Sequence, residues 1–300
     1  MSDTILLEYQ GEFSKGWKLD DVVRMVETIP PMPQAARKTL ELVEDPNSTP
    51  YEIAGIMARD PALVSTVMRA ANSAALGRSE TVVALEEAIL VVGLGSIKSI
   101  VLGMTLKKWN KSFGPTEKLI WEKSLGTAAA AYVLATFLGK TYQDTARLCG
   151  LLHNLGQIVM LSLPDIRAKY PEVFAYIREH GVSFVEAERA VIGLTHPLVG
   201  AMVGRKWQLP FSICNTILRY DEPFEGIDNT QDEQIALTKL AAELSLCAGL
   251  GCPEGHPLFC SSLRPVALAL GFEESTLMAD QAVLARQTKV LYATEAVAYN

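Results

Sequence analysis

The sequence predicts an all-α fold with a dozen or more helices, most of them short. Helix-start signals, in which a small polar residue precedes a proline or a glutamate follows three positions later, recur from end to end of the chain. Apolar residues follow these signals at helical separations, as in Leu63, Val67, Met68 and Ala71. Strand-like alternation is nearly absent, and its best candidate, Thr81–Leu85, is short.

The start and stop signals place individual helices along the chain. Thr49 is a cap that is followed by a proline at the first helical position and by Glu52 at the third. Asp60-Pro61 repeats the cap and proline, and Ser183 with Glu186 forms another capping box. Two further starts are expected at His196-Pro197 and Leu209-Pro210, and helix ends are expected at Gly77, Gly114, Gly139 and Gly181.

The composition argues against several classes of function. Hydrophobic residues make up 49% and charged residues 20% of the 300 residues, which is an ordinary globular balance. The net charge of -7 argues against nucleic acid or an anionic membrane as a partner. The longest uncharged stretch, Ser124–Gly139, is too short to span a bilayer and is expected to be a buried helix. An odd count of five cysteines and the lack of secretory-signal features predict a reduced, cytoplasmic protein.

The chain is expected to divide near residues 110–115. The segment Lys107–Pro115 is polar and ends in a Gly-Pro breaker, as is typical of a linker. We therefore expect an N-terminal arm at residues 1–17, an N-terminal helical subdomain at 18–113 and a second helical subdomain, with the C-terminal helices, at 114–300.

Several short motifs occur together along the chain. They are Ile29-Pro-Pro-Met-Pro33, Asp60-Pro-Ala-Leu63, Arg69-Ala-Ala-Asn-Ser-Ala74, Glu87-Ala-Ile-Leu-Val-Val-Gly-Leu-Gly95, Trp121-Glu-Lys-Ser124 and Gly150-Leu-Leu-His-Asn-Leu-Gly156. In their order and number they resemble the HDOD family, bacterial signalling proteins related to HD-type phosphohydrolases. The resemblance covers about two-thirds of the chain, from Lys18 to Leu218. It implies an HD-domain-like helical bundle with an N-terminal helical subdomain.

The same resemblance places His153-Asn154 where metal-dependent HD proteins have a histidine followed by an aspartate. A neutral amide is a poorer ligand than a carboxylate for a hard divalent ion. Other ligand positions hold a lysine and an Arg219-Tyr220 pair, and two cations would repel a metal. The vestigial metal-site positions are Lys123, His153, Asn154, His196, Arg219 and Glu243. We therefore expect no catalytic metal centre and no cofactor; the alternative is a metal-dependent phosphohydrolase with weak or altered activity.

Two interpretations of the vestigial site remain open. If Lys123, Arg219, His153 and His196 converge, they suit an anion such as a phosphate-bearing small molecule or a carboxylate of a partner. The structural alternative is that His153 is a hydrogen-bonded core residue and that the two cations pair with carboxylates, namely Glu122, Glu222 or Glu243.

Two other groups of residues are candidate sites. Asp60, Asn72 and Ser73 flank a predicted helix and either fix a structural corner or contact a ligand. Four soft or borderline ligands near the C-terminus have a spacing that could hold zinc, although buried structural thiols are the simpler interpretation. These four residues are Cys247, Cys252, His256 and Cys260.

The resemblance implies a regulatory role in a bacterial cytoplasm. Proteins of this family accompany kinase, receiver or cyclic-dinucleotide-turnover modules. We therefore expect a non-catalytic signalling protein that acts through contacts with such proteins and that an anionic small ligand could gate. The sequence itself indicates neither an oligomeric state nor a particular partner.

Overall fold

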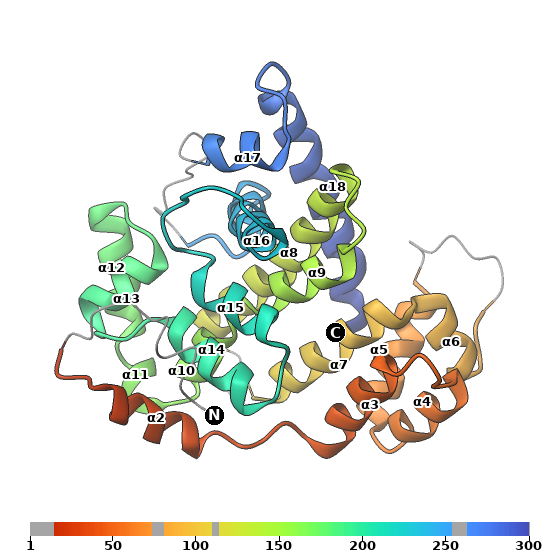
Figure 1. The fold of residues 1–300 in the computed structure, drawn as a ribbon. Coiled ribbons are helices and arrows are strands. Elements are labelled where there is room, and N and C mark those ends of the chain that lie inside the picture. Colours follow the sequence, from red (N-terminus) through yellow and green to blue (C-terminus); the bar gives the residue numbers. More distant parts are fainter. Residues whose placement is uncertain (1–14, 74–80, 110–113, 254–262, 300) are drawn as a thin grey trace. The chain divides into compact units, whose positions relative to one another are not determined.

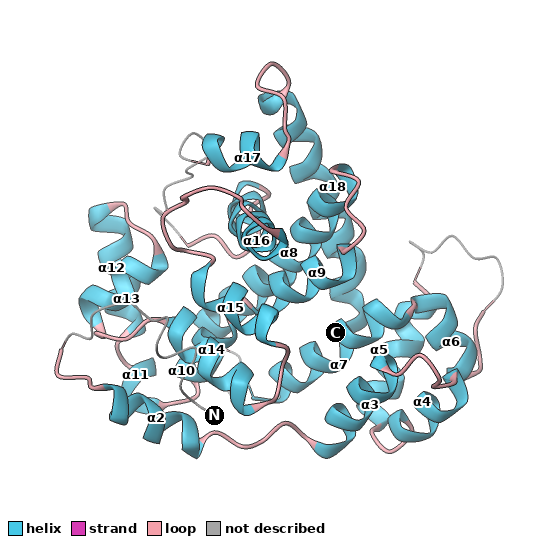
Figure 2. Ribbon diagram, in the orientation of Figure 1, coloured by secondary structure: helices cyan, strands magenta, loops and turns pink. Residues whose placement is uncertain are grey.

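Helices account for every regular element in the described part of the chain (Figure 2). The computed structural model describes residues 15–73, 81–109, 114–253 and 263–299. The all-α prediction is confirmed, and the strand candidate is not a strand, because residues 81–84 lack regular structure and a helix begins at Leu85. The described residues form two compact units.

The first unit comprises the chain up to Pro31 and residues Trp109–Lys289. It contains one N-terminal helix and most of the helices that follow residue 114 (Figure 1). They are α2 (Leu19–Thr28), α8 (Pro115–Phe137), α9 (Gln143–Leu152), α10 (Leu155–Leu161), α11 (Pro164–Arg167), α12 (Tyr170–His180), α13 (Phe184–Val191), α14 (His196–Lys206), α15 (Phe211–Arg219), α16 (Thr230–Cys247), α17 (Arg264–Leu270) and α18 (Leu277–Tyr299) as far as Lys289.

The second unit comprises Met32–Lys108 together with the chain from Val290 onward. The expected division at residue 113 falls on residues 110–113, which lie outside the described residues, so it stays a prediction. The helices of this unit are α3 (Gln34–Glu44), α4 (Pro50–Met57), α5 (Pro61–Ala71), α6 (Leu85–Val92), α7 (Leu94–Trp109) as far as Lys108, and the last turns of α18.

The alanine-rich stretch of α8 forms the centre of the first unit. Ala128, Ala129, Ala130 and Ala131 are all at most 2% exposed, as expected for a buried helix. Helices α9 and α16 pack against α8. Small side chains allow helix backbones to approach closely: a Cβ on Gly150 of α9 would lie 2.5 Å from the carbonyl oxygen of Thr127.

Helices α10 and α14 also pack with their backbones in contact. A Cβ on Gly156 of α10 would lie 1.9 Å from the carbonyl oxygen of His196, and one on Gly200 of α14 would lie 2.9 Å from the backbone nitrogen of Gly156. Both positions therefore require glycine. The contact fixes the segment around His153 against the first turn of α14.

Within the first unit, the C-terminal end of helix α2 is held by residues at the end of α14. The Lys206 ammonium donates to the carbonyls of Val26 and Glu27, at 3.0 and 2.8 Å. These last carbonyls of a helix have no partner within the helix, and a cation there is also favoured by the helix dipole. The Trp207 indole donates to the Pro30 carbonyl at 3.2 Å and so holds the chain that leaves α2.

The end of the N-terminal arm is held in a similar way. The Trp17 indole donates to the Ile192 carbonyl at 3.1 Å, so the last residue of the predicted arm contacts the first unit. Residues 1–14 of that arm lie outside the described residues.

The predicted helix starts are confirmed. Thr49 and Ser183 form capping boxes at the starts of α4 and α13, and Asp60 accepts from the first free amides of α5. Helices α14 and α15 begin at His196 and just after Pro210.

Among the expected helix ends, Gly139 and Gly181 follow the last residues of α8 and α12 with positive φ. The expected helix end at Gly114 is wrong. Gly114 is the N-cap of α8, because Pro115 after it is suited to a first helical position. Gly77 lies outside the described residues.

Membrane-spanning helices were also sought among the described residues. There, no single helix has the length and apolar character needed to cross a bilayer. Helices α6 and α7 pass that test only as a pair, and they are bent by 105° relative to each other.

We predict that Gly156→Ala destabilises the first unit by at least about 2 kcal/mol, because the added methyl group has no space against the backbone of α14. Gly55→Ala is the matched control: this helical glycine of α4 has no atom within 4 Å of an added Cβ. The control should be neutral or stabilising by up to about 1 kcal/mol, through helix propensity. Urea denaturation followed by circular dichroism checks both, and equal effects of the two variants would contradict the close packing.

Candidate functional site

His153 and Asn154 lie in the core of the first unit, at the junction between α9 and α10. His153 is the C-cap of α9 and Asn154 is the N-cap of α10, and both are fully buried. The His153 Nδ1 lies 2.6 Å from the Gly150 carbonyl, which can only accept, so Nδ1 carries the proton. The prediction of a hydrogen-bonded core histidine is therefore confirmed.

The other ring nitrogen of His153 carries a lone pair. Burial lowers the pKa of His153 well below its usual value, and the charge of Lys123 lowers it further. Nε2 makes no hydrogen bond within the described protein, nor do the two amide atoms of Asn154 or the Oε1 of Gln157. The α9–α10 junction thus holds several buried polar atoms, and His153 contributes an acceptor there rather than a donor.

Glu188 of α13 is the most heavily hydrogen-bonded carboxylate in this region. It is fully buried. Its Oε1 accepts from the Gln157 amide at 2.8 Å and from the Tyr170 hydroxyl at 3.1 Å. Its Oε2 accepts from the backbone N–H of His196 at 2.8 Å and from His196 Nδ1 at 2.7 Å. Burial alone raises the pKa of Glu188, but the attraction and hydrogen bonds of His196 outweigh it and hold the pKa below its usual value.

Both ring nitrogens of His196 are engaged. Nδ1 donates to Glu188, and Nε2 lies 2.5 Å from the Tyr220 hydroxyl, which can donate to it or accept from it. This holds for either protonation state of the ring. His196 has no free lone pair for a metal ion unless the Tyr220 hydroxyl moves away.

Tyr220 occupies the position next to both histidines. Its ring meets the His153 ring edge to face, with centroids 5.1 Å apart. Burial raises the pKa of Tyr220 well above its usual value, and the charges of Asp221 and Glu188 act in the same direction. The hydroxyl therefore stays protonated, and the phenol is a neutral hydrogen-bonding group.

Lys123 of α8 is a buried cation close to this cluster. It is 5% exposed, and its Nζ lies 4.7 Å from the centroid of the Phe184 ring, in the geometry of a cation–π contact. Burial lowers the pKa of Lys123, while the charges of Asp221, Glu188 and Glu243 raise it. Burial is the larger effect, so the pKa of Lys123 lies below its usual value and the carboxylates offset the effect only in part.

The turn after α16 packs directly on the backbone of this lysine. A Cβ on Gly251 would lie 2.4 Å from the Cα of Lys123, and Gly251 has a positive φ of 65°. Both facts require glycine at position 251. The turn therefore covers α8 at the point where Lys123 projects.

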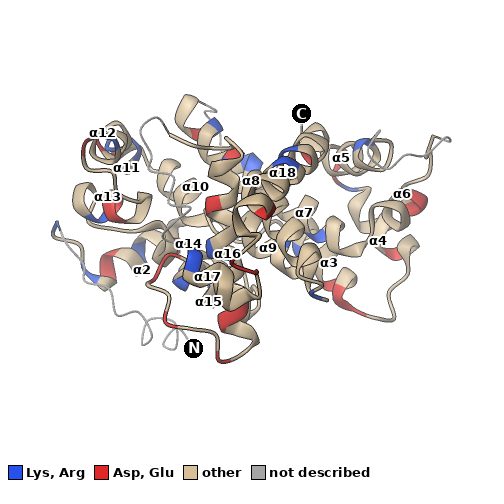
Figure 3. Cartoon of the chain, turned by 90° about the horizontal axis from the view of Figure 1, so that it is seen from above, with Lys and Arg blue, Asp and Glu red and all other residues tan. Residues whose placement is uncertain are grey.

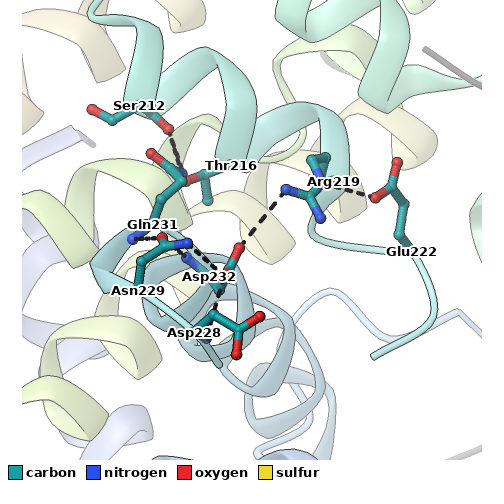
Figure 4. A network of polar contacts seen from close by, with 8 residues as sticks. All are labelled: Ser212, Thr216, Arg219, Glu222, Asp228, Asn229, Gln231 and Asp232. Atoms are coloured by element: carbon teal, nitrogen blue, oxygen red, sulfur yellow. Dashed lines mark hydrogen bonds and ion pairs between the residues drawn. The ribbon is translucent and has the colours of Figure 1, made fainter. Parts of the chain in front are cut away.

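Arg219, which the anion-site interpretation places in the cluster, does not join it. Its guanidinium lies 3.0 Å from a Glu222 carboxylate oxygen and 3.8 Å from one of Asp232, and the side chain is 37% exposed (Figure 4). The predicted alternative pairing with Glu222 is confirmed. Arg219 and Tyr220 are adjacent at the end of α15, and a step of one residue turns a helix by about 100°, so only one of them can face the histidines.

The network around Arg219 ties α15 to the start of α16. Asn229 caps α16 through its side-chain oxygen, and the Gln231 amide donates to Thr216 Oγ1 at 2.9 Å (Figure 4). Glu243, the last of the vestigial positions, is half-buried on α16 and lines an apolar pocket with α17 and α18. Its charge acts on Lys123 and raises the pKa of that lysine.

The candidate residues of the second unit have structural roles. Asp60 caps α5 and forms an ion pair with Lys108 at 2.5 Å. The Asn72 amide nitrogen donates to the Met68 carbonyl at 3.0 Å and to the Val82 carbonyl at 2.9 Å, and its oxygen accepts from the Val82 amide at 2.8 Å. Asn72 therefore fixes a corner. Ser73, half-buried after α5, makes a backbone bond to the Ala70 carbonyl.

The candidate zinc ligands lie only partly within the described chain. Cys247 and Cys252 are half-buried thiols, whereas His256 and Cys260 lie outside the described residues. Among the residues that the structure describes, no three His, Cys, Asp or Glu side chains are grouped so that they could hold a metal ion.

The family profile described as "HDOD domain" matches residues 29–223, about two-thirds of the chain. The chain belongs to the HDOD family. A protein of Treponema pallidum (strain Nichols), which bears the name "Uncharacterized protein", is 26% identical to it over 194 residues. That match covers 64% of this chain and 37% of the relative, so this HDOD chain spans little more than a third of its curated relative.

Solved structures confirm the HDOD fold. An HDOD domain protein from Geobacter sulfurreducens superposes with a TM-score of 0.74 at 20% identity, over 92% of this chain and 98% of that one. A candidate phosphohydrolase from Shewanella amazonensis SB2B gives 0.67 at 18%, over 91% and 97%. A candidate signal transduction protein from Marinobacter aquaeolei VT8 gives 0.69 at 19%, over 98% and 64%.

The metal centre of HD-type proteins does not fit the residues of this HDOD chain. His196 has both nitrogens engaged, Asn154 is an amide, and Lys123 adds a buried amine to the same region. Of the vestigial positions, His153 and Asn154 have side-chain atoms without a hydrogen-bond partner within the described protein, and the Asn154 oxygen is a neutral amide ligand rather than a carboxylate.

Sequence reasoning missed Glu188, Gln157 and the glycine pair at 156 and 200. Glu188 had a readable signal. It follows Phe184 by four positions and Ala187 by one, so it lies on the apolar face of its helix, where a charged residue needs a buried partner. Gln157 and the two glycines carry no such signal, because their role depends on which helices meet.

We predict that His153 makes the stability of this HDOD protein sensitive to acid. Its pKa in the folded protein is lowered, so the unfolded chain binds more protons between the two pKa values. Its stabilising contribution is complete above about pH 6.5 and decreases as pH falls toward the folded pKa, by at most about 1.4 kcal/mol per pH unit.

The variant His153→Gln should therefore show a shallower loss of stability than the wild type between about pH 7 and pH 5. His180→Gln, at an exposed histidine of α12, is the matched control and should keep the wild-type slope. Urea denaturation across this range measures the slopes. Parallel curves for the wild type and His153→Gln would contradict the buried neutral state of His153.

Proposed function

We propose that this HDOD chain is a non-catalytic signalling protein of the bacterial cytoplasm that acts through contacts with other proteins. The observation that carries the proposal is the engagement of both His196 ring nitrogens, by Glu188 and by Tyr220. A histidine held in this way supports the packing of α13, α14 and α15. It is not available to a metal ion.

The alternative, a metal-dependent phosphohydrolase, needs several ligands that project into one open site. Here His153 Nε2 is a single free imidazole lone pair, and its neighbours in the described structure are an amide and a phenol. The name of the Shewanella amazonensis protein agrees with this alternative, but at 18% identity that protein supports the fold alone.

An anionic ligand that gates the protein also receives little support from the geometry. Arg219 points to Glu222 and Asp232, and His153 presents a lone pair rather than a proton. The charges that act on Lys123 come from carboxylates, which repel an anion. The arrangement therefore favours Lys123 as an internal counter-ion of these carboxylates.

Protein contact is supported by exposed apolar side chains in one short segment of the second unit. Val83, Leu90 and Leu94 are 82%, 68% and 46% exposed; Val83 precedes α6, Leu90 lies within it and Leu94 begins α7. Apolar side chains gathered into one exposed patch are typical of interaction surfaces, and these three residues are the patch that we propose. In the view of Figure 3, acidic and basic residues are interspersed along the described chain. The kinase, receiver and cyclic-dinucleotide-turnover modules of the family are the partners we propose.

Purified wild-type protein should show no metal-dependent phosphohydrolase activity. We expect no turnover of p-nitrophenyl phosphate, bis-p-nitrophenyl phosphate or a cyclic dinucleotide with Mn²⁺, Fe²⁺ or Mg²⁺ beyond that of His153→Ala, and no stoichiometric metal by elemental analysis. Asn154→Asp alone should stay inactive, because His196 remains engaged. Turnover by the wild type that His153→Ala abolishes would overturn the non-catalytic proposal.

The contact surface can be tested with purified candidate modules. We expect at least one kinase, receiver or cyclic-dinucleotide-turnover domain to bind, and Leu90→Lys to weaken that binding about tenfold or more, which corresponds to about 1.4 kcal/mol. Phe211→Lys is the control, because Phe211 is 41% exposed in the first unit. Biolayer interferometry gives the affinities. Binding that is indifferent to substitutions at Leu90, Val83 and Leu94 would remove this surface from the proposal.

A further inference from the structure

The last turn of α18 is inserted into a fitted slot in the second unit. Tyr299 is 5% exposed, and its hydroxyl donates to the Ser99 carbonyl of α7 at 3.2 Å. The phenol ring lies against Gly103 of the same helix: a Cβ there would be 2.6 Å from the Tyr299 hydroxyl and 2.8 Å from a ring carbon. The slot therefore has a hydrogen-bond acceptor for the hydroxyl and requires a glycine behind the ring.

Two cations bind the backbone end of this turn. The Arg69 guanidinium donates to the Ala298 carbonyl at 2.7 Å, and the Lys107 ammonium donates to the Tyr299 carbonyl. Arg69 is oriented by a second hydrogen bond, to Ser65 Oγ at 2.7 Å. The last carbonyls of a helix lack partners within it and carry partial negative charge, so paired cations recognise a helix end.

The attachment of α18 within the second unit is concentrated at this tip. Ala298 and Tyr299 are 3% and 5% exposed, whereas Val290 and Val297 of the same helix are 65% and 51% exposed. No long apolar face of α18 is therefore buried in this unit. One tyrosine and two carbonyl contacts hold the end of this helix.

We propose that the slot formed by Ser99, Gly103, Arg69 and Lys107 is a recognition site for a helical turn that ends in tyrosine. In this structure it holds residues 290–299 of its own chain, and the same segment of a second copy is the partner that it fits. A segment tethered in the same chain has an effective concentration on the order of millimolar, so the chain's own tyrosine must leave the slot before the segment of a second copy can enter it. This site is independent of the proposed signalling function.

The test uses the full-length chain with Tyr299→Ala, which vacates the slot, and a fluorescent peptide of residues 286–300. We expect this peptide to bind Y299A at least tenfold more tightly than the wild-type protein, whose slot is filled. The same peptide with alanine in place of Tyr299 should not bind. The double variant G103V/Y299A should not bind the original peptide, because the valine side chain fills the slot. Fluorescence anisotropy measures these affinities.

Equal binding to the wild type and Y299A, or binding that ignores Gly103, would overturn the proposal, as would no binding to a folded Y299A. If Y299A does not fold, Gly103→Ala decides the question by hydrogen exchange. Amides of residues 296–299 should then exchange at least tenfold faster than in the wild type, while those of α8 keep their protection. Unchanged exchange at the end of α18 would refute the slot.

Discussion

The backbone contact between α10 and α14 is the constraint on which the candidate site depends. Gly156 lies against the carbonyl of His196, and Gly200 lies against the backbone of Gly156. This contact brings the α9–α10 junction, with His153 and Asn154, next to the helix that carries His196. Because the two backbones touch at these glycines, one helix cannot slide along the other without a clash. The polar groups of the site are therefore positioned by packing before any hydrogen bond is considered.

The buried charges of this region are satisfied within the chain. Glu188 receives hydrogen bonds from three residues, and Lys123 sits over an aromatic ring among carboxylates. Removing one partner of such a group leaves the other uncompensated in the core, which is strongly destabilising. The side chains that leave no place for a metal ion are thus also buried polar partners of one another. The stability of the core depends on all of them being present.

Much of the fold could be predicted from local sequence signals. Capping residues such as Thr49 and Ser183 act on their own backbone neighbours, so their effect is readable without tertiary structure. The candidate site was harder to predict. Whether Arg219 or Tyr220 faces His196 depends on the rotation of α15 by a single residue, which the packing of neighbouring helices decides. Glu188 became a partner of His196 only through the crossing of α13 and α14.

The double engagement of His196 also bears on how this chain can change over generations. A single substitution that placed an aspartate at position 154 would bury a further carboxylate in the core, while the lone pair of His196 is already in use. Replacing Tyr220 first would leave His196 without its hydrogen-bond partner. Each single change thus disturbs the buried hydrogen bonds of this core. We therefore expect substitutions to accumulate at the surface of this protein rather than in this core.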